Sequence, residues 1–228
     1  MKKIVTTALA LAIAVPAFAG PVRISQVYGG SGNLPGSTYR QDYIELHNFG
    51  PSPVSVGGWS IYVAPATGNF GTNRYDIPAQ IPGTTNPPTI PACGYLLLAV
   101  GATSASGAAY PVAADLSTTT PNLSGINGKI ALISGGTAGN GVCPTGNVED
   151  VVTYGVATAC EGSPAPALST TTALVRKLGG VEDSNDNSID FEIVSNPQPR
   201  NSTSPANTNC LATPTRTSSW GSIKTLYR

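Results

Sequence analysis

The sequence has few of the residues that most enzymes and nucleic-acid-binding proteins need. His47 is the only histidine, and only 11% of the residues are charged. The 12 basic residues are matched by 12 acidic ones, so no basic excess is available to neutralise nucleic-acid phosphates. The serines stand in no G-x-S-x-G or S-x-x-K motif. These absences disfavour nucleic-acid binding and Ser-His-Asp chemistry.

Apart from the N-terminus, the chain also lacks a long apolar run. Lys2 and Lys3 precede the run TTALALAIAVPAF, and Ala17-Phe18-Ala19 follows it. This pattern predicts a signal peptide over residues 1–19, because the run is shorter than the roughly 20 residues of a membrane span. We expect the mature chain to begin at Gly20, with 228 − 19 = 209 residues and no transmembrane segment. It would be secreted, to the extracellular space, the cell surface or the periplasm.

Glycine and proline are abundant, at 26 and 20 residues, and no stretch has a convincing helical periodicity. Short segments rich in β-branched residues are instead bounded by turn residues, which predicts strands. Asn127-Gly128 predicts a type I′ hairpin turn. Together these features predict one all-β domain, an immunoglobulin-like β-sandwich with a coil-rich C-terminal tail. The predicted strands cover residues 22–28, 42–48, 59–64, 94–100, 129–134, 148–155 and 172–178.

Several residues are candidates for a site. Alternation along YIELHNFG places Glu45 and His47 on an outward face, and no nucleophile accompanies them, so we interpret them as ordinary surface residues. GGSGN at 29–33 lacks the lysine and the helix of a phosphate-binding loop, which favours a flexible loop. Trp59 and Tyr62 are expected in the core. Three tyrosines near the first loop form a possible aromatic partner patch: Tyr28, Tyr39 and Tyr43.

The segment VEDSNDNSIDFE carries the densest set of carboxylate and amide oxygens. Asp183, Asn185 and Asn187 match the first three ligand positions of an EF-hand calcium loop, and Asp186 lies among them. The match stops there, because Ser188 replaces the glycine and Val194 the bidentate glutamate. The alternatives are therefore a Ca²⁺ site or a solvated turn whose side chains cap their own backbone. No other cofactor is expected.

From about residue 196 the chain contains almost no large apolar residue, so we expect an extended linker or loosely attached coil. Apolar residues return in SWGSIKTLYR. A short helix there would gather Trp220, Ile223 and Tyr227 on one side. Lys224 and Arg228 would lie in its last turn. This end either docks on its own sandwich or acts as a sorting or attachment signal.

The blocks VRISQVYGGSGN, YIELHNFGPSPVSVGGWSIYVA, GKIALI, VEDVVTYGVATACEG, TTALVRK and DSNDNSIDF with NPQPRNS occur in this order. In that order they resemble the lamin-tail domain, most closely the type found in secreted bacterial proteins. The resemblance implies a lamin-tail-like domain over residues 20–203, followed by a Ser/Thr/Pro/Asn-rich spacer and short C-terminal segment over 204–228. It also implies a binding or targeting module with no catalytic residues.

Four cysteines in an exported chain predict disulfides, and four cysteines allow three pairings. The resembling secreted domains often have cysteines around the strand at 148–155, which implies the pair Cys143–Cys160. Cys93 would then join Cys210. We expect a non-enzymatic module whose partner is a protein or cell-surface component. The alternatives are a subunit of an extracellular or surface assembly and a minimal metal-dependent secreted hydrolase.

Overall fold

The protein is a β-sandwich, seen here in a computed structural model that describes residues 20–32 and 36–210. This confirms the all-β sandwich class. Its elements are β1 (Val22–Tyr28), β2 (Asp42–Asn48), β3 (Val54–Ser55), β4 (Ser60–Ala64), β5 (Arg74–Asp76), β6 (Thr89–Ile90), β7 (Tyr95–Val100), β8 (Leu116–Ser117), β9 (Gly128–Ile133), β10 (Val148–Tyr154), β11 (Thr172–Arg176), α1 (Lys177–Gly180), α2 (Asn187–Asp190) and β12 (Phe191–Ser195).

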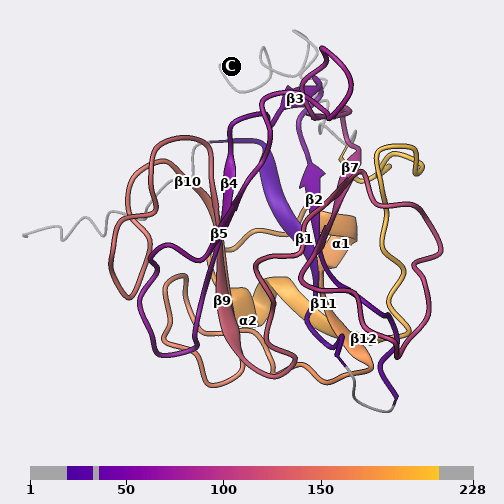
Figure 1. Cartoon of the computed structure of the whole chain (residues 1–228). Helices are drawn as coiled ribbons and strands as arrows, with labels where there is room; N and C mark the ends of the chain where they lie inside the picture. The colour runs from indigo at the N-terminus through magenta and orange to yellow at the C-terminus, as the bar shows by residue number, and fades with distance from the viewer. Residues whose placement is uncertain (1–19, 33–35, 211–228) are drawn as a thin grey trace, which may run out of the picture.

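Two sheets form the layers of the sandwich. The larger has six strands in the order β12-β11-β1-β2-β7-β8, and the smaller has four in the order β10-β9-β4-β5. Neighbours are antiparallel except β7 and β8, which run parallel. Figure 1 shows the two groups side by side, and β3 pairs with β6 in a separate two-stranded ribbon.

The main core lies between the sheets, where alternating strand residues meet. Ile44 and Leu46 of β2 belong to it, as the alternation predicts, and Trp59 packs against it partly buried. The outer faces of both sheets are also covered. Tyr62 lies in a cluster outside the smaller sheet. Four tyrosines pack ring against ring outside the larger one, at centroid distances of 5.3–6.0 Å: Tyr28, Tyr39, Tyr43 and Tyr110. Tyr28, Tyr39 and Tyr43 are therefore buried and form no surface patch.

The Asn127-Gly128 hairpin prediction is wrong. Gly128 is the first residue of β9, and the strand before it, β8, belongs to the other sheet. The glycine is needed for close packing, because a Cβ there would lie 2.9 Å from the Tyr154 hydroxyl oxygen. The local dipeptide pattern marks a place where the chain crosses between sheets.

Residues 196–210 are held against the sandwich, so the prediction of an extended linker or loosely attached coil is wrong for the described part. Arg200 forms an ion pair with buried Glu45 at 2.7 Å, and Asn207 donates from its backbone to the Cys93 carbonyl at 2.8 Å. Asn201 and Asn207 are buried. Polar contacts hold this coil against the larger sheet, so it needs few apolar residues.

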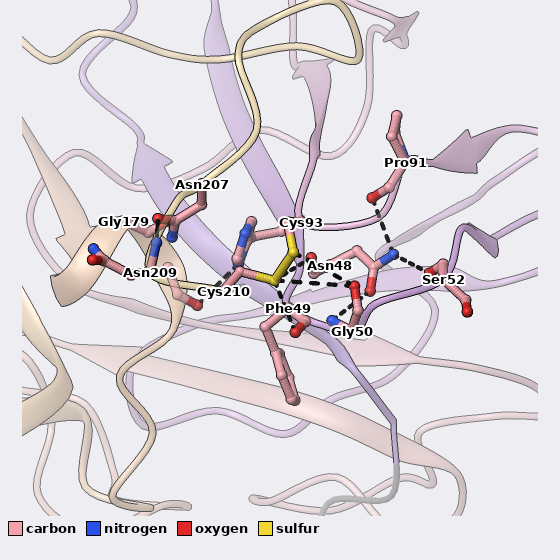
Figure 2. Close-up of a disulfide and its surroundings, with 12 residues drawn as sticks. Asn48, Phe49, Gly50, Ser52, Pro91, Cys93, Gly179, Asn207, Asn209 and Cys210 are labelled. Atoms are coloured by element: carbon pink, nitrogen blue, oxygen red, sulfur yellow. Dashed lines mark hydrogen bonds between the residues drawn. A yellow bond between two sulfur atoms is a disulfide. The ribbon is translucent and has the colours of Figure 1, made fainter. Parts of the chain in front are cut away.

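Two disulfides, Cys93–Cys210 and Cys143–Cys160, are present, which is the pairing that the family resemblance implies. The Cys93–Cys210 bridge ties the coil to the turn before β7. Figure 2 shows it beside Phe49, Gly50 and Asn207. The Cys210 sulfur also approaches the Phe49 carbonyl oxygen at 3.0 Å. Cys143–Cys160 instead closes a local loop around β10.

Two predictions fall outside the described residues. They are the signal peptide over 1–19 and the C-terminal set Trp220, Ile223, Lys224, Tyr227 and Arg228. Within the described ranges, no helix is long and apolar enough to cross a membrane.

The Cys93–Cys210 bridge should contribute more stability than Cys143–Cys160, because their sequence separations are 117 and 17 residues. In the chain-entropy model these loops correspond to about 5 and about 3 kcal/mol. We expect the double substitution Cys93→Ala/Cys210→Ala to lower the free energy of unfolding more than Cys143→Ala/Cys160→Ala does, and to expose amides of 196–210 to hydrogen exchange. Urea denaturation and exchange mass spectrometry test this. Equal losses for the two variants would contradict it.

Candidate functional site

A cavity of about 570 Å³ opens at one end of the sandwich, between three loops. The loops follow β1 (Gly29–Ser31), precede β9 (Leu123–Ile126) and precede β11 (Leu168–Thr170). They meet because β1 and β11 are antiparallel, with Val27 opposite Leu174, so the end of one strand lies beside the start of the other. Its volume falls in the range of small-ligand sites.

Asp42, at the start of β2, holds two of these loops together. Its carboxylate accepts from the backbone N–H of Ser31 and of Leu123, both at 3.0 Å. Asp42 is only 2% exposed, and burial raises the pKa of its carboxyl group, while these hydrogen bonds oppose the rise. The carboxylate therefore links two of the loops by hydrogen bonds behind the cavity.

The first two glycines of GGSGN, Gly29 and Gly30, are required by close packing. A Cβ on Gly29 would lie 2.4 Å from the Ser124 carbonyl oxygen, and one on Gly30 would lie 2.7 Å from the Thr170 backbone. Both separations are below van der Waals contact. Gly29 and Gly30 thus let three loops approach closely.

The lining is uncharged. None of the ten residues around this cavity has an ionisable side chain, and they are glycine, serine, threonine, leucine and isoleucine. Leu123 and Leu168 are nearly buried, whereas Ile126 is 61% exposed. The cavity is therefore suited to an uncharged, largely apolar group, with hydroxyl and backbone groups available for hydrogen bonds.

The ionisable groups are concentrated elsewhere, around Arg176 between the sheets. Arg176 is fully buried and forms ion pairs with Asp150 of β10 at 2.7 Å and Asp190 at 3.4 Å. Its guanidinium stacks over Phe191 at 4.4 Å. The Asp150 oxygen that binds Arg176 also accepts a hydrogen bond from the backbone N–H of Ile24, at 2.7 Å. This network joins the two sheets.

Asn187 closes the free edge of β10. Its amide oxygen accepts from the Thr153 N–H at 2.6 Å, and its amide nitrogen donates to the Val151 carbonyl at 3.1 Å. The side chain thus takes the place of a neighbouring strand. The same nitrogen donates to the Glu161 carboxylate at 2.7 Å. Burial, and then the charge of Asp150, raise the pKa of Glu161 to about 8.

The four residues predicted as calcium ligands do not converge. Asp183 pairs with Arg23 at 2.9 Å. Asp186 caps α2 by accepting from the Ser188 N–H at 3.0 Å, and Asn187 is committed to β10. Asn185 has a left-handed backbone, φ 58°. Within the described residues, no three His, Cys, Asp or Glu side chains are grouped to hold a metal ion. The segment instead packs around Arg176 and along the edge of β10, and the Ca²⁺ site stays a prediction.

Glu45 and His47 share the outward face, as predicted, but they are buried and not solvent-exposed. The C-terminal coil covers them, and Arg200 binds Glu45 through its side chain and its backbone N–H. Burial lowers the pKa of His47 to about 4, and the Arg200 charge also lowers it, so the ring is neutral. His47 packs on Tyr95 at 4.7 Å. Neither side chain lines the cavity between the loops.

Fold and site thus define an all-β sandwich with an internal ionic network and an uncharged cavity at one end. No family model matches the chain, and no curated protein matches it closely enough to be a relative. It is similar to a DUF4876 family protein from Bacteroides thetaiotaomicron VPI-5482, whose structure is solved. The TM-score is 0.50 and the identity 12%, with 76% of this chain and 70% of that chain covered. This likeness shows the fold alone.

Removing the Arg176 charge should be strongly destabilising. Arg176→Met leaves Asp150 and Asp190 buried without their cation, and breaking a buried pair costs about 3–5 kcal/mol. Urea denaturation measures the loss. The matched control is Arg74→Met, which removes an exposed pair with Asp76 and should leave stability close to wild type. A loss for Arg176→Met no larger than for the control would show that the network is dispensable.

Stability should fall as pH rises from about 4.5 to about 8 because of Glu161. Its folded-state pKa is raised, so the folded state keeps a proton that the unfolded state releases over this window. We expect Glu161→Gln to flatten this part of the pH profile of the urea midpoint. Glu192→Gln, at an exposed position of β12, serves as the control and should retain the slope.

Proposed function

We propose that this protein is an exported, non-catalytic module of the lamin-tail type that binds a protein or cell-surface component through the cavity at the loop end. The proposal is based on one observation: the buried ionisable groups and the accessible cavity lie in different parts of the structure. Asp150, Asp190, Glu45 and Arg176 are fully buried and paired inside the structure. The cavity between the loops has no ionisable lining.

This separation argues against a hydrolase. General acid–base or nucleophilic chemistry needs titratable groups within hydrogen-bond reach of a bound substrate. Here the groups with raised pKa values, such as Glu161 and Asp150, are in contact with the protein's own backbone and side chains. A recognition site has the opposite requirement, a preformed surface that loses little entropy on binding. The hydrogen bonds of Asp42 and the close packing at Gly29 and Gly30 provide that rigidity.

Export is supported by the two disulfides, which persist in oxidising spaces and are compatible with an extracellular or periplasmic location. The uncharged lining favours a ligand group without formal charge, because a charged group would lose its hydration without gaining a partner. Ile126, on the rim, is the side chain that a partner would bury first.

The mature chain, residues 20–228, should co-sediment with a cell-envelope fraction of the producing organism. Ile126→Asp places a charge on the rim and should weaken this retention roughly tenfold, as expected for a central contact residue. Ile189→Asp is the matched control, since Ile189 is 52% exposed on α2, away from the cavity lining. It should bind like wild type.

Equal retention of both variants would show that the cavity is not the binding surface. Self-association of the free protein in light scattering, in place of envelope binding, would favour the assembly alternative. Sustained turnover of DNA or a phosphoester by purified protein, lost in Asp183→Ala, would favour the metal-dependent hydrolase.

A further inference from the structure

Glu149 of β10 is a buried carboxylate that has no charge partner among the residues that the structure describes. It is 7% exposed, and its Oε2 has no hydrogen-bond partner. The ion pairs among the described residues involve Arg23, Arg74, Arg176 and Arg200, and none of them includes Glu149. An unpaired charge in such a position is costly, because the protein replaces its water shell with nothing.

The Glu149 carboxylate lies directly against Gly20. A Cβ built on Gly20 would fall 1.8 Å from Glu149 Oε2 and 3.2 Å from Oε1. With standard bond lengths the Gly20 nitrogen lies about 2.5 Å from that Cβ position, hence within about 4.3 Å of Oε2. That is close to ion-pair distance before any local rotation.

Gly20 is also held in place from its other side. Nη1 of Arg23 donates to the Gly20 carbonyl at 2.6 Å and to the Glu149 carbonyl at 3.2 Å. The same guanidinium binds Asp183 through Nε at 2.9 Å. Arg23 therefore fixes the backbone of Gly20 beside β10 while its own charge is directed to Asp183.

We propose that the free α-ammonium of Gly20, produced when the signal peptide is removed, is the ion-pair partner of Glu149. This inference rests on the export part of the proposed function. Hydrolysis of the Ala19–Gly20 bond consumes one water, leaves a carboxylate on Ala19 and an amine on Gly20. The amine takes up a proton at neutral pH, because an α-amino group has a pKa of about 8.

The consequence is a difference between precursor and mature chain. In the precursor the Gly20 nitrogen is a neutral amide, so Glu149 stays unpaired and the folded state is less stable. After cleavage, the Gly20 ammonium pairs with the Glu149 carboxylate at this end of β10. The ammonium has no side-chain entropy to lose, because it is on the backbone. The native fold is thus consolidated by processing, after the chain has been exported.

A double-mutant cycle tests the pair directly. One axis is the terminus of the chain 20–228, free or acetylated. The other is Glu149 or Glu149→Gln. In urea denaturation at neutral pH, acetylation should lower the folding equilibrium constant about tenfold with Glu149 present, the scale of a partly buried ion pair. In the Glu149→Gln variant acetylation should have little effect. Glu192→Gln, the exposed control, should leave the acetylation effect unchanged.

Equal effects of acetylation with and without Glu149, or no effect in either, would overturn the proposal. So would N-terminal sequencing of the exported protein that found a start other than Gly20. The envelope-binding experiment is independent of this cycle. Retained envelope binding with no coupling rejects this inference alone, and coupling without envelope binding rejects only the proposed binding role.

Discussion

The buried guanidinium of Arg176 is the constraint around which the sandwich is arranged. It belongs to β11 of the six-stranded sheet, yet its partner Asp150 belongs to β10 of the other sheet. Asp150 then reaches back to the backbone of β1, at the bulge after Ile24. Close apolar packing already resists displacement of the two sheets, and a charge pair removed from water adds the requirement of one hydrogen-bonded geometry. The pair therefore fixes how the sheets face each other.

The same charge explains why the acidic segment before β12 folds as it does. Arg176 donates to the Glu182 carbonyl and approaches Asp183 and Asp190, so the chain is drawn around the guanidinium. In its course it delivers Asn187 to the open edge of β10. A segment whose composition is similar to that of a calcium-binding loop thus surrounds the Arg176 guanidinium.

The sequence was sufficient for elements whose signal is local. The strands over 22–28 and 42–48 have the predicted bounds, because alternation and flanking turn residues act within a few positions. It was insufficient where a partner lies far along the chain. Glu45 looks like a surface residue beside its neighbours, but its cation Arg200 is 155 positions away.

The site shows the same limit. The composition of GGSGN predicts a loop, but the need for Gly29 and Gly30 arises from the Ser124 and Thr170 backbones, which no local pattern places beside them. Asp42 belongs to no recognisable motif either, and only the fold places its carboxylate between the two loops behind the cavity. The prediction for the coil after residue 196 is wrong for a related reason. Low hydrophobicity predicts disorder when apolar burial is the only source of stability, and here ion pairs, amide hydrogen bonds and a disulfide supply it.

These features assign different work to the two ends of the molecule. Charges and the Cys93–Cys210 bridge lie between the sheets and around the end that holds Phe49 and Gly50, where they resist separation of the layers. The opposite end, around Gly29 and Ile126, is built from uncharged residues, and the buried Asp42 carboxylate binds one of its loops from behind. The binding surface that we propose must be accessible to a partner, whereas the ionic network must be shielded from water. The fold meets both requirements, because the cavity lies among the loops at one end and the Arg176 network lies between the sheets.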